Sequence, residues 1–322
     1  MSRRGWLLFI AMSVIWGTPY LLIRVAVREL SPATLVFART LPAAILLIPL
    51  AAHRGHLRPL LRYWRWIVLY TAVELALPWL FLSEAEQRLT SSTAGLLIAT
   101  VPLIAVVLYR VVSPTTERIT RRRFLGLIIG FAGVAALVGI DLRGTDLVAV
   151  AEIAVPAVGY SIGPLIISRR LSGLPSLGVV SASVALTAIV YAPVALTHLP
   201  RHVSFEVVAA VAGLAFVCTA LAFLVFFALI AEVGPARSTV ITYLNPAVAV
   251  LLGVVLLGES FTVGIAVGFP LILVGSVLAT GSPTPAVVDE VVADPPTPQE
   301  PLSRVRANPP RTTRPRTSWR RR

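Results

Sequence analysis

Residues 242–275 read TYLNPAVAVLLGVVLLGESFTVGIAVGFPLILVG and contain two apolar runs separated by Gly258-Glu259-Ser260. Each run approaches the length of about 20 residues that a helix needs to cross a bilayer. The pattern has an earlier counterpart in the chain. Pro102 aligns with Pro246 at an offset of 144, and four positions align at an offset of 142: Glu117 with Glu259, Thr120 with Thr262, Gly126 with Gly268 and Gly133 with Gly275. These five matches predict an internal repeat.

The composition is that of an integral membrane protein. Hydrophobic residues make up 57% of the chain and charged residues 13%, whereas soluble domains carry about 25% charged residues. All 28 basic residues are arginine, which excludes a Schiff-base lysine and a lysine-containing phosphate-binding loop. The single cysteine, Cys218, excludes an intrachain disulfide. Four histidines in loops show no metalloprotease pattern, so we expect no metal site and no cofactor.

Ten apolar runs are long enough to be transmembrane helices. The first follows Arg3 and Arg4 like a signal peptide, but it is longer and has no cleavage motif, so we expect a retained helix. The ten runs are residues 5–24, 32–52, 66–84, 92–112, 122–140, 146–168, 176–197, 206–231, 238–257 and 262–280.

Arginines predict the orientation. With the N-terminus inside, fourteen loop arginines face the cytoplasm and five face outward, as the positive-inside rule requires. Ten helices then place both termini in the cytoplasm. Five helices per repeat is an odd number, so the repeats at 1–143 and 144–280 are expected to be inverted relative to each other. Residues 281–322 hold nine prolines and eight arginines, which predicts a disordered cytoplasmic tail.

Two interrupted helices supply aromatic candidates for a cavity. Trp16 and Tyr20 flank Gly17 and Pro19 on one helix face, where proline frees a carbonyl that is tolerated beside protein or a water-filled cavity. The repeat offset brings Tyr160 into the register of Trp16, again in a stretch with Gly163 and Pro164. Trp16, Tyr20 and Tyr160 are therefore candidate substrate-binding residues, and a packed aromatic pair is the alternative for Trp16 and Tyr20.

Three ionisable residues fall inside apolar runs: Arg39, Glu74 and Glu152. Charges at this depth are costly and mark binding or proton pathways unless they pair. Arg39 is a candidate anion-binding group, and Glu74 is the candidate proton-coupling group because desolvation favours its neutral form. A structural Arg39–Glu74 ion pair is the alternative, and Glu152 is expected near the outer interface.

Asn245 is the only asparagine or glutamine in the apolar runs. It could hydrogen-bond a substrate or the carbonyls freed by Pro246. Glu117 and Glu259 precede Thr120 and Thr262, whose hydroxyls suit the N-caps of the next helices. We interpret these four loop residues as structural.

These residues together resemble the EamA-type families of the drug/metabolite transporter superfamily. The resemblance covers roughly residues 5–280 and rests on Trp16-Gly17, Arg39, Pro102 and Asn245-Pro246, followed by Leu257-Gly258-Glu259 and a glycine-rich last helix. It implies an all-α membrane protein with ten helices, cytoplasmic termini and a central cavity between inverted halves. Glu74 and the Thr116-Glu117-Arg118 segment depart from the shared pattern.

The expected function is therefore a secondary transporter, an exporter of small metabolites, amino acid-like compounds or drugs across the cytoplasmic membrane by alternating access. Its expected partners are a small-molecule substrate and the lipid bilayer, with proton coupling and without nucleic acid. An enzyme is disfavoured because no carboxylates or histidines cluster at the membrane face. The remaining alternative is a non-transporting membrane protein that binds partners through its basic tail.

Overall fold

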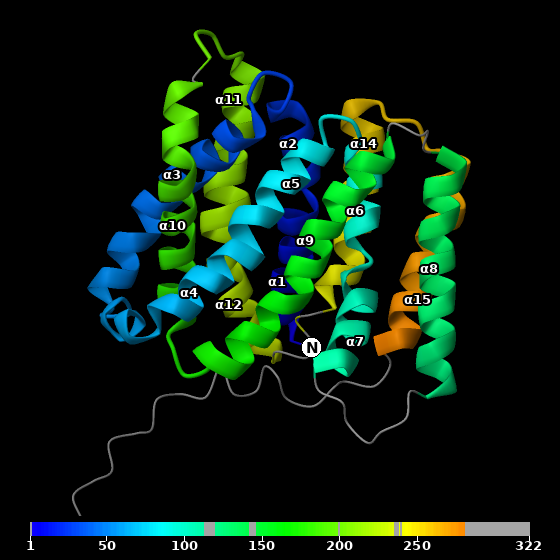
Figure 1. The fold of residues 1–322 in the computed structure, drawn as a ribbon, viewed down its shortest axis with the longest axis horizontal. Helices are drawn as coiled ribbons and strands as arrows, with labels where there is room; N and C mark the ends of the chain where they lie inside the picture. Colours follow the sequence, from blue (N-terminus) through cyan, green and yellow to red (C-terminus); the bar gives the residue numbers. More distant parts are fainter. Residues whose placement is uncertain are drawn as a thin grey trace, which may run out of the picture. The chain divides into compact units, whose positions relative to one another are not determined.

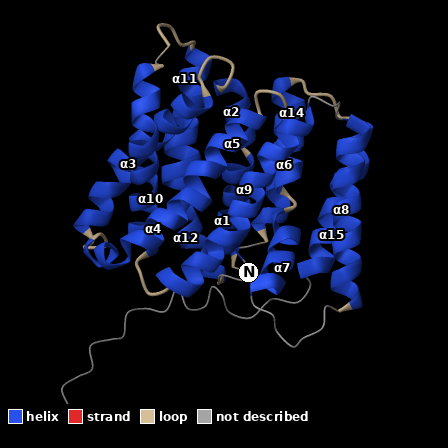
Figure 2. Ribbon diagram, viewed as in Figure 1, coloured by secondary structure: helices blue, strands red, loops and turns tan. Residues whose placement is uncertain are grey.

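The computed structural model describes residues 2–112, 120–141, 146–198, 200–234, 238 and 240–280. Within these ranges the chain forms helices and connecting loops, without strands (Figures 1 and 2). Predictions that concern Glu117, Arg143, Arg237 and the tail at 281–322 lie outside the described residues.

The helices follow one another with short connections. Two π-helical segments, η2 and η4, interrupt long helices, a third, η3, ends one, and η1 is a 3₁₀ helix. In chain order the elements are α1 (Arg3–Gly17), α2 (Pro19–Ala26), α3 (Pro32–His53), η1 (Arg58–Tyr63), α4 (Trp64–Tyr70), η2 (Thr71–Ala76), α5 (Leu77–Ala85), α6 (Ser91–Ile98), α7 (Val101–Val112), α8 (Arg121–Asp141), α9 (Asp146–Ile166), η3 (Ile167–Leu171), α10 (Ser176–Thr197), α11 (Phe205–Ala212), η4 (Gly213–Leu221), α12 (Ala222–Val233), α14 (Ile241–Leu257) and α15 (Val263–Thr280).

Nine helical segments in the described ranges are long and apolar enough to cross a membrane, and their bounds follow nine of the ten predicted runs. The first joins α1 and α2 across Arg3–Ala26, and the third joins η1 to α5 across Arg58–Ala85. The remaining run corresponds to α14, an apolar helix of 17 residues. The structure thus supports a multi-pass, all-helical membrane fold.

The connections show the predicted capping chemistry. Thr120 and Thr262 accept hydrogen bonds from Arg123 N at 3.3 Å and Ile265 N at 3.2 Å, so both are N-caps as the sequence predicts. Between α1 and α2, Thr18 donates to the Val14 carbonyl at 2.7 Å, where Pro19 begins a new helix.

Glycines allow the closest helix packing. α8 packs along α15, and a methyl group on Gly133 or Gly268 would lie 2.8 or 2.9 Å from backbone atoms of the opposite helix. The approaches at Gly126 and Gly275 to backbone atoms of the opposite helix are closer still. Small residues permit such close approach of helices in membranes.

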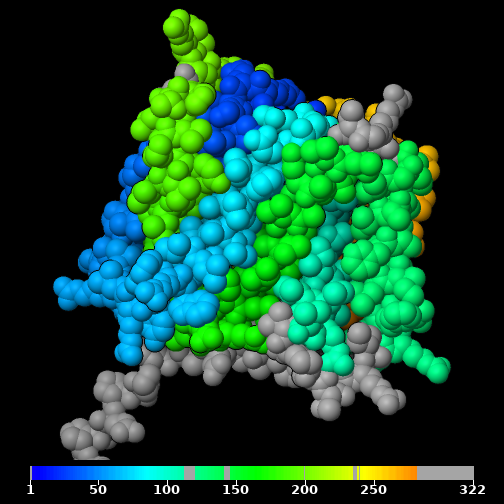
Figure 3. Space-filling view, in the orientation of Figure 1, coloured from blue at the N-terminus to red at the C-terminus, as the bar shows by residue number. Residues whose placement is uncertain are grey.

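A diagonal band crosses the face shown in Figure 3, where the segment from α4 to α5 lies beside α9. Figure 1 shows the same two segments crossing in front of α1 and α12. Both α5 and η2 pack against α9. This junction of the predicted halves carries Glu74 and Tyr160.

Glu259 joins two distant parts of the chain. Its carboxylate accepts hydrogen bonds from the backbone N–H groups of Ser91 at 2.7 Å and Ser92 at 3.0 Å, at the start of α6, and from the Ser92 hydroxyl. It is a charged helix cap, favoured by the helix dipole. The structural interpretation of Glu259 therefore holds, with a partner that the sequence did not indicate.

Glu259→Ala is expected to destabilise the protein by about 2 kcal/mol, because it removes charge-assisted hydrogen bonds to the first two N–H groups of α6. Thermal unfolding in detergent measures the loss, with the exposed Glu206→Ala as the matched control. An unchanged melting temperature in Glu259→Ala would show that the cap contributes nothing to stability.

Candidate functional site

Four residues predicted from sequence meet in the interior of the helix bundle: Tyr20 of α2, Arg39 of α3, Glu74 of η2 and Tyr160 of α9. The Tyr160 hydroxyl is the common neighbour, within electrostatic range of Tyr20, Arg39 and Glu74. Tyr20 and Arg39 are buried, with 8% and 3% exposure. The structure therefore brings together residues from both predicted repeats, spread over about 140 positions of sequence.

Arg39 carries a buried positive charge. Its guanidinium lies 4.0 Å from the centre of the Trp79 ring and donates one hydrogen bond, of 3.2 Å, to Thr219. Its Nε atom is buried and has no hydrogen-bond partner among the described residues. Ion pairs within 4.0 Å in the described residues join Arg4 with Glu232 and Arg88 with Glu152. The alternative of an Arg39–Glu74 ion pair is therefore wrong for this conformation, because the guanidinium packs on the tryptophan instead.

Glu74 lies in the π-helical segment η2. Single turns of π-helix inside α-helices are often found at functional sites. The Glu74 Oε2 atom is buried and has no hydrogen-bond partner within the described ranges, and a methyl group on Gly163 of α9 would collide with this carboxylate. Gly159, one turn earlier, gives the same close approach to the Val73 carbonyl. The glycines of α9 thus make room for a carboxylate at the helix junction.

Glu86 is a residue that the sequence analysis missed. It follows α5 in a stretch rich in charged residues, which resembles a solvated loop, yet it has 0% exposure. Both of its carboxylate oxygens are buried, and neither has a hydrogen-bond partner in the part of the chain that the structure describes. Burial raises the pKa of the Glu86 carboxyl, Arg24 and Arg39 oppose this shift, and Glu259 adds to it.

Arg24 holds the Glu86 segment in place by donating to its backbone carbonyl. Tyr20 is also within electrostatic range of the Glu86 carboxylate. Glu86 therefore extends the group around Tyr160 toward the end of the bundle where α2 and α5 finish. The internal repeat would not have revealed Glu86, because none of the positions that align between the two repeats lies at this residue.

Trp16 and Asn245 lie apart from this group. Trp16 packs on Phe226 and Phe223, with ring centres 4.7 and 6.2 Å away. The Asn245 backbone packs against α1: a methyl group on Gly17 would lie 3.0 Å from the Asn245 carbonyl oxygen. The Asn245 Oδ1 atom is buried without a partner in the described part of the chain, so it has an unused acceptor.

Glu152 is held at the periphery. It accepts a hydrogen bond from Arg88, and its side chain retains 18% exposure. This placement agrees with the expectation of an interfacial position. The interior charges are therefore Arg39, Glu74 and Glu86.

This arrangement can bind a small polar solute. A guanidinium without a carboxylate partner attracts an anionic group, while aromatic faces and tyrosine hydroxyls suit an organic body with polar ends. Two carboxylates with unused oxygens can accept a proton or an amine. Sites for small molecules combine apolar walls with a few convergent polar groups in this way.

Comparison with known proteins identifies the family. The model of the EamA-like transporter family matches residues 3–139 and again residues 148–281. The chain is 32% identical over 261 residues to a protein described as the uncharacterized inner membrane transporter YedA of Escherichia coli K12, covering 78% of this chain and 82% of YedA. The YedA proteins of strains O6:H1 and O157:H7 match equally well.

A solved crystal structure has the same fold. It superposes with a TM-score of 0.61 at 22% sequence identity, covering 87% of this chain and 97% of its own. The helical architecture, the match to the family model and the relatives all indicate that this chain is a multi-pass membrane transporter. The chain belongs to the EamA-like transporter family.

Proposed function

We propose that this protein is a secondary transporter that exports small metabolites, amino acid-like compounds or drugs bearing a negatively charged group. The observation that carries the proposal is the buried Arg39 guanidinium, which packs on Trp79 and has no carboxylate of the described residues within 4.0 Å. Arg39 interacts with the Glu86 carboxyl only beyond ion-pair distance, and a charge without an ion pair is costly in a membrane interior. Its retention is accounted for if a substrate anion neutralises it during each cycle.

Alternating access of two inverted repeats is the proposed mechanism. The double match of the family model, at 3–139 and 148–281, supports a duplication. The π-helical segments support it independently. Adding the repeat offsets of 142 and 144 to Thr71–Ala76 gives residues 213–220, which lie inside η4 (Gly213–Leu221). Both proposed halves would then carry a π-segment beside the site, η2 with Glu74 and η4 with Thr219.

Glu74 is the proposed proton-coupling group. Its unpartnered oxygen and its place near Tyr160 would let it lose a proton when the site opens and regain one when the site closes. The neutral carboxyl avoids the cost of carrying a charge through the closed state. Glu86 offers a second protonatable carboxylate toward the other end of the group.

Tyr20 and Tyr160 are the proposed walls of the substrate site. Trp16 and Asn245 are proposed to contact substrate in another conformation of the cycle, since here Trp16 packs on Phe226 and Phe223.

Metabolite profiling tests the proposed function and identifies the cargo in the same experiment. Cells that overproduce the protein are expected to accumulate one or more anionic or zwitterionic metabolites in the medium. Cells that produce Arg39→Gln at the same membrane level are expected not to. Accumulation of the same compounds with both proteins would contradict a binding role for Arg39, and no change with either would contradict export.

The proposed orientation places both termini in the cytoplasm and gives a separate prediction. A reporter fused after Ala52, at the end of α3, is expected to report cytoplasm, and one fused after Arg143 is expected to report the outside. The physical reason is the excess of arginine at one end of the helices. An outside signal from the fusion after Ala52 would reverse the orientation and, with it, the proposed direction.

A further inference from the structure

A cavity of about 370 Å³ lies between the start of the third span and the end of α9. Figure 1 shows that these two segments lie at the end of the bundle where α1 begins. Its walls come from the η1–α4 segment and from the turn after η3. The lining residues are Tyr63, Trp66, Arg169, Arg170, Leu171, Ser172, Gly173 and Leu174. None of these residues belongs to the group around Tyr160.

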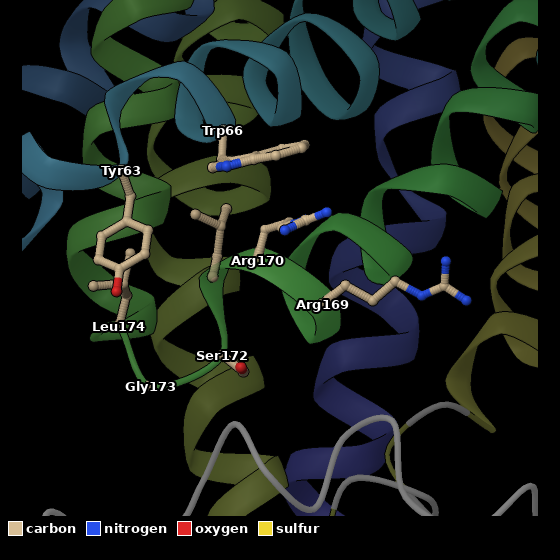
Figure 4. A pocket seen from close by; sticks show the side chains of 8 residues that line it. Tyr63, Trp66, Arg169, Arg170, Ser172, Gly173 and Leu174 are labelled. Atoms are coloured by element: carbon tan, nitrogen blue, oxygen red, sulfur yellow. The ribbon is translucent and has the colours of Figure 1, made fainter.

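Two aromatic and two cationic side chains shape this cavity. Figure 4 shows the Arg170 guanidinium beside the Trp66 ring, and their separation is 4.5 Å. Stacking on an indole holds a guanidinium in place and leaves its N–H edge open to an anion. The turn below contributes the Ser172 hydroxyl, while Tyr63 lies across from it (Figure 4). The cavity thus presents fixed hydrogen-bond donors.

The surroundings of the cavity are basic in sequence. Residues 30–73 and 153–205, which supply both walls, contain no aspartate or glutamate. The η1–α4 segment adds three more arginines, Arg58, Arg62 and Arg65. Positive charge therefore accumulates here without acidic residues nearby in the chain, and an anion is the complementary ligand.

The residues around the cavity have the composition of a membrane–water interface. On the same segment Leu61 is 76% exposed and Trp64 is 57% exposed, which requires an apolar medium. Arg65 lies over the Trp64 ring at 5.5 Å. Tryptophan, tyrosine and arginine mixed with exposed leucine are typical of the membrane–water interface.

We infer that this cavity binds the phosphate head group of an anionic phospholipid, with Arg170 as the charged ligand and Trp66 as the support for Arg170. Basic cavities between helices at a membrane surface bind such head groups. In the proposed orientation the lipid comes from the cytoplasmic leaflet. Because the cavity is separate from the Arg39 site, this inference does not depend on the transport activity.

Native mass spectrometry of the full-length protein in detergent with added phosphatidylglycerol or phosphatidylcholine tests the inference. Phosphatidylglycerol is expected to be retained in preference to phosphatidylcholine. Arg170→Ala is expected to weaken this retention about tenfold, since it removes charge-assisted hydrogen bonds to phosphate. Arg54→Ala removes the same charge at the same end, outside the cavity, and is expected to change retention less than about twofold.

Trp66→Leu provides a variant that leaves the net charge unchanged, and it too is expected to weaken retention. Equal losses in Arg170→Ala and Arg54→Ala, or equal retention of both lipids, would overturn the inference in favour of unspecific attraction. Displacement of phosphatidylglycerol by inorganic phosphate at a concentration equal to that of the lipid would also overturn it, because the lipid part would then add nothing to binding and the ligand would be a soluble phosphate compound.

Discussion

Arg39→Gln is expected to lower transport about 100-fold while leaving the protein folded and in the membrane. A charge-assisted interaction of about 3 kcal/mol with a substrate anion accounts for a factor of this size. Stability should not fall, because the substitution removes a buried charge that forms no ion pair with a carboxylate in the described part of the chain. Transport of the profiled metabolite into inverted membrane vesicles, together with thermal unfolding, measures both quantities.

Two further variants make the Arg39 result specific. Arg28→Gln removes an exposed arginine at the outer end of the proposed topology and is expected to transport normally. Arg39→Lys keeps the charge without the planar fork, and we expect it to recover part of the activity. If Arg39→Gln instead unfolds at a lower temperature and transports normally when folded, Arg39 has a structural role.

Glu74→Gln is expected to abolish proton movement driven by the substrate. The amide has the shape of the neutral carboxyl but cannot release a proton, so the closed conformations remain accessible while coupling is lost. Purified protein in liposomes that contain a pH-sensitive dye, with the substrate added on one side, measures the flux. Unchanged proton flux in Glu74→Gln, with substrate transport confirmed, would eliminate Glu74 as the coupling group.

Glu86→Gln is the informative companion in the same assay. Glu86 has two unpartnered oxygens and a pKa that burial raises, so it can also carry a proton. Loss of flux in Glu74→Gln alone would assign coupling to the π-helical segment. Loss in Glu86→Gln alone would move it to the end of the group beside Arg24.

The sequence predicted the helices well because their signal is local. Runs of apolar residues between arginine clusters define the spans, and threonines such as Thr120 and Thr262 mark helix starts by their own chemistry. The proximity of Tyr20, Arg39 and Tyr160 could also be predicted from the sequence, because polar and aromatic residues in apolar runs are few. The π-helical segments η2 and η4, which depart from the α-helical pattern, were not predicted.

Contacts between distant segments could not be read from the chain. Nothing in sequence indicates that Arg39 packs on Trp79 and not beside Glu74, since both arrangements satisfy the same composition. The burial of Glu86 could not be predicted for a related reason. It depends on α2 and on Arg24, which donates a hydrogen bond to the Glu86 backbone carbonyl across 62 positions of sequence. The π-helical geometry of η2 and η4 likewise depends on packing, with Gly159 and Gly163 of α9 adapting to η2.

The most direct test of alternating access at the Arg39 site uses Cys218, the only cysteine of the chain. It is buried, with 4% exposure, and is the sequence neighbour of Thr219, which accepts the Arg39 hydrogen bond. In sealed vesicles of defined orientation, the rate of Cys218 modification by a membrane-impermeant thiol reagent is measured from each side. The account predicts that the reagent reacts from both sides during the cycle and that saturating substrate changes the two rates in opposite directions. A Cys218 that reacts from neither side, with or without substrate, would contradict it.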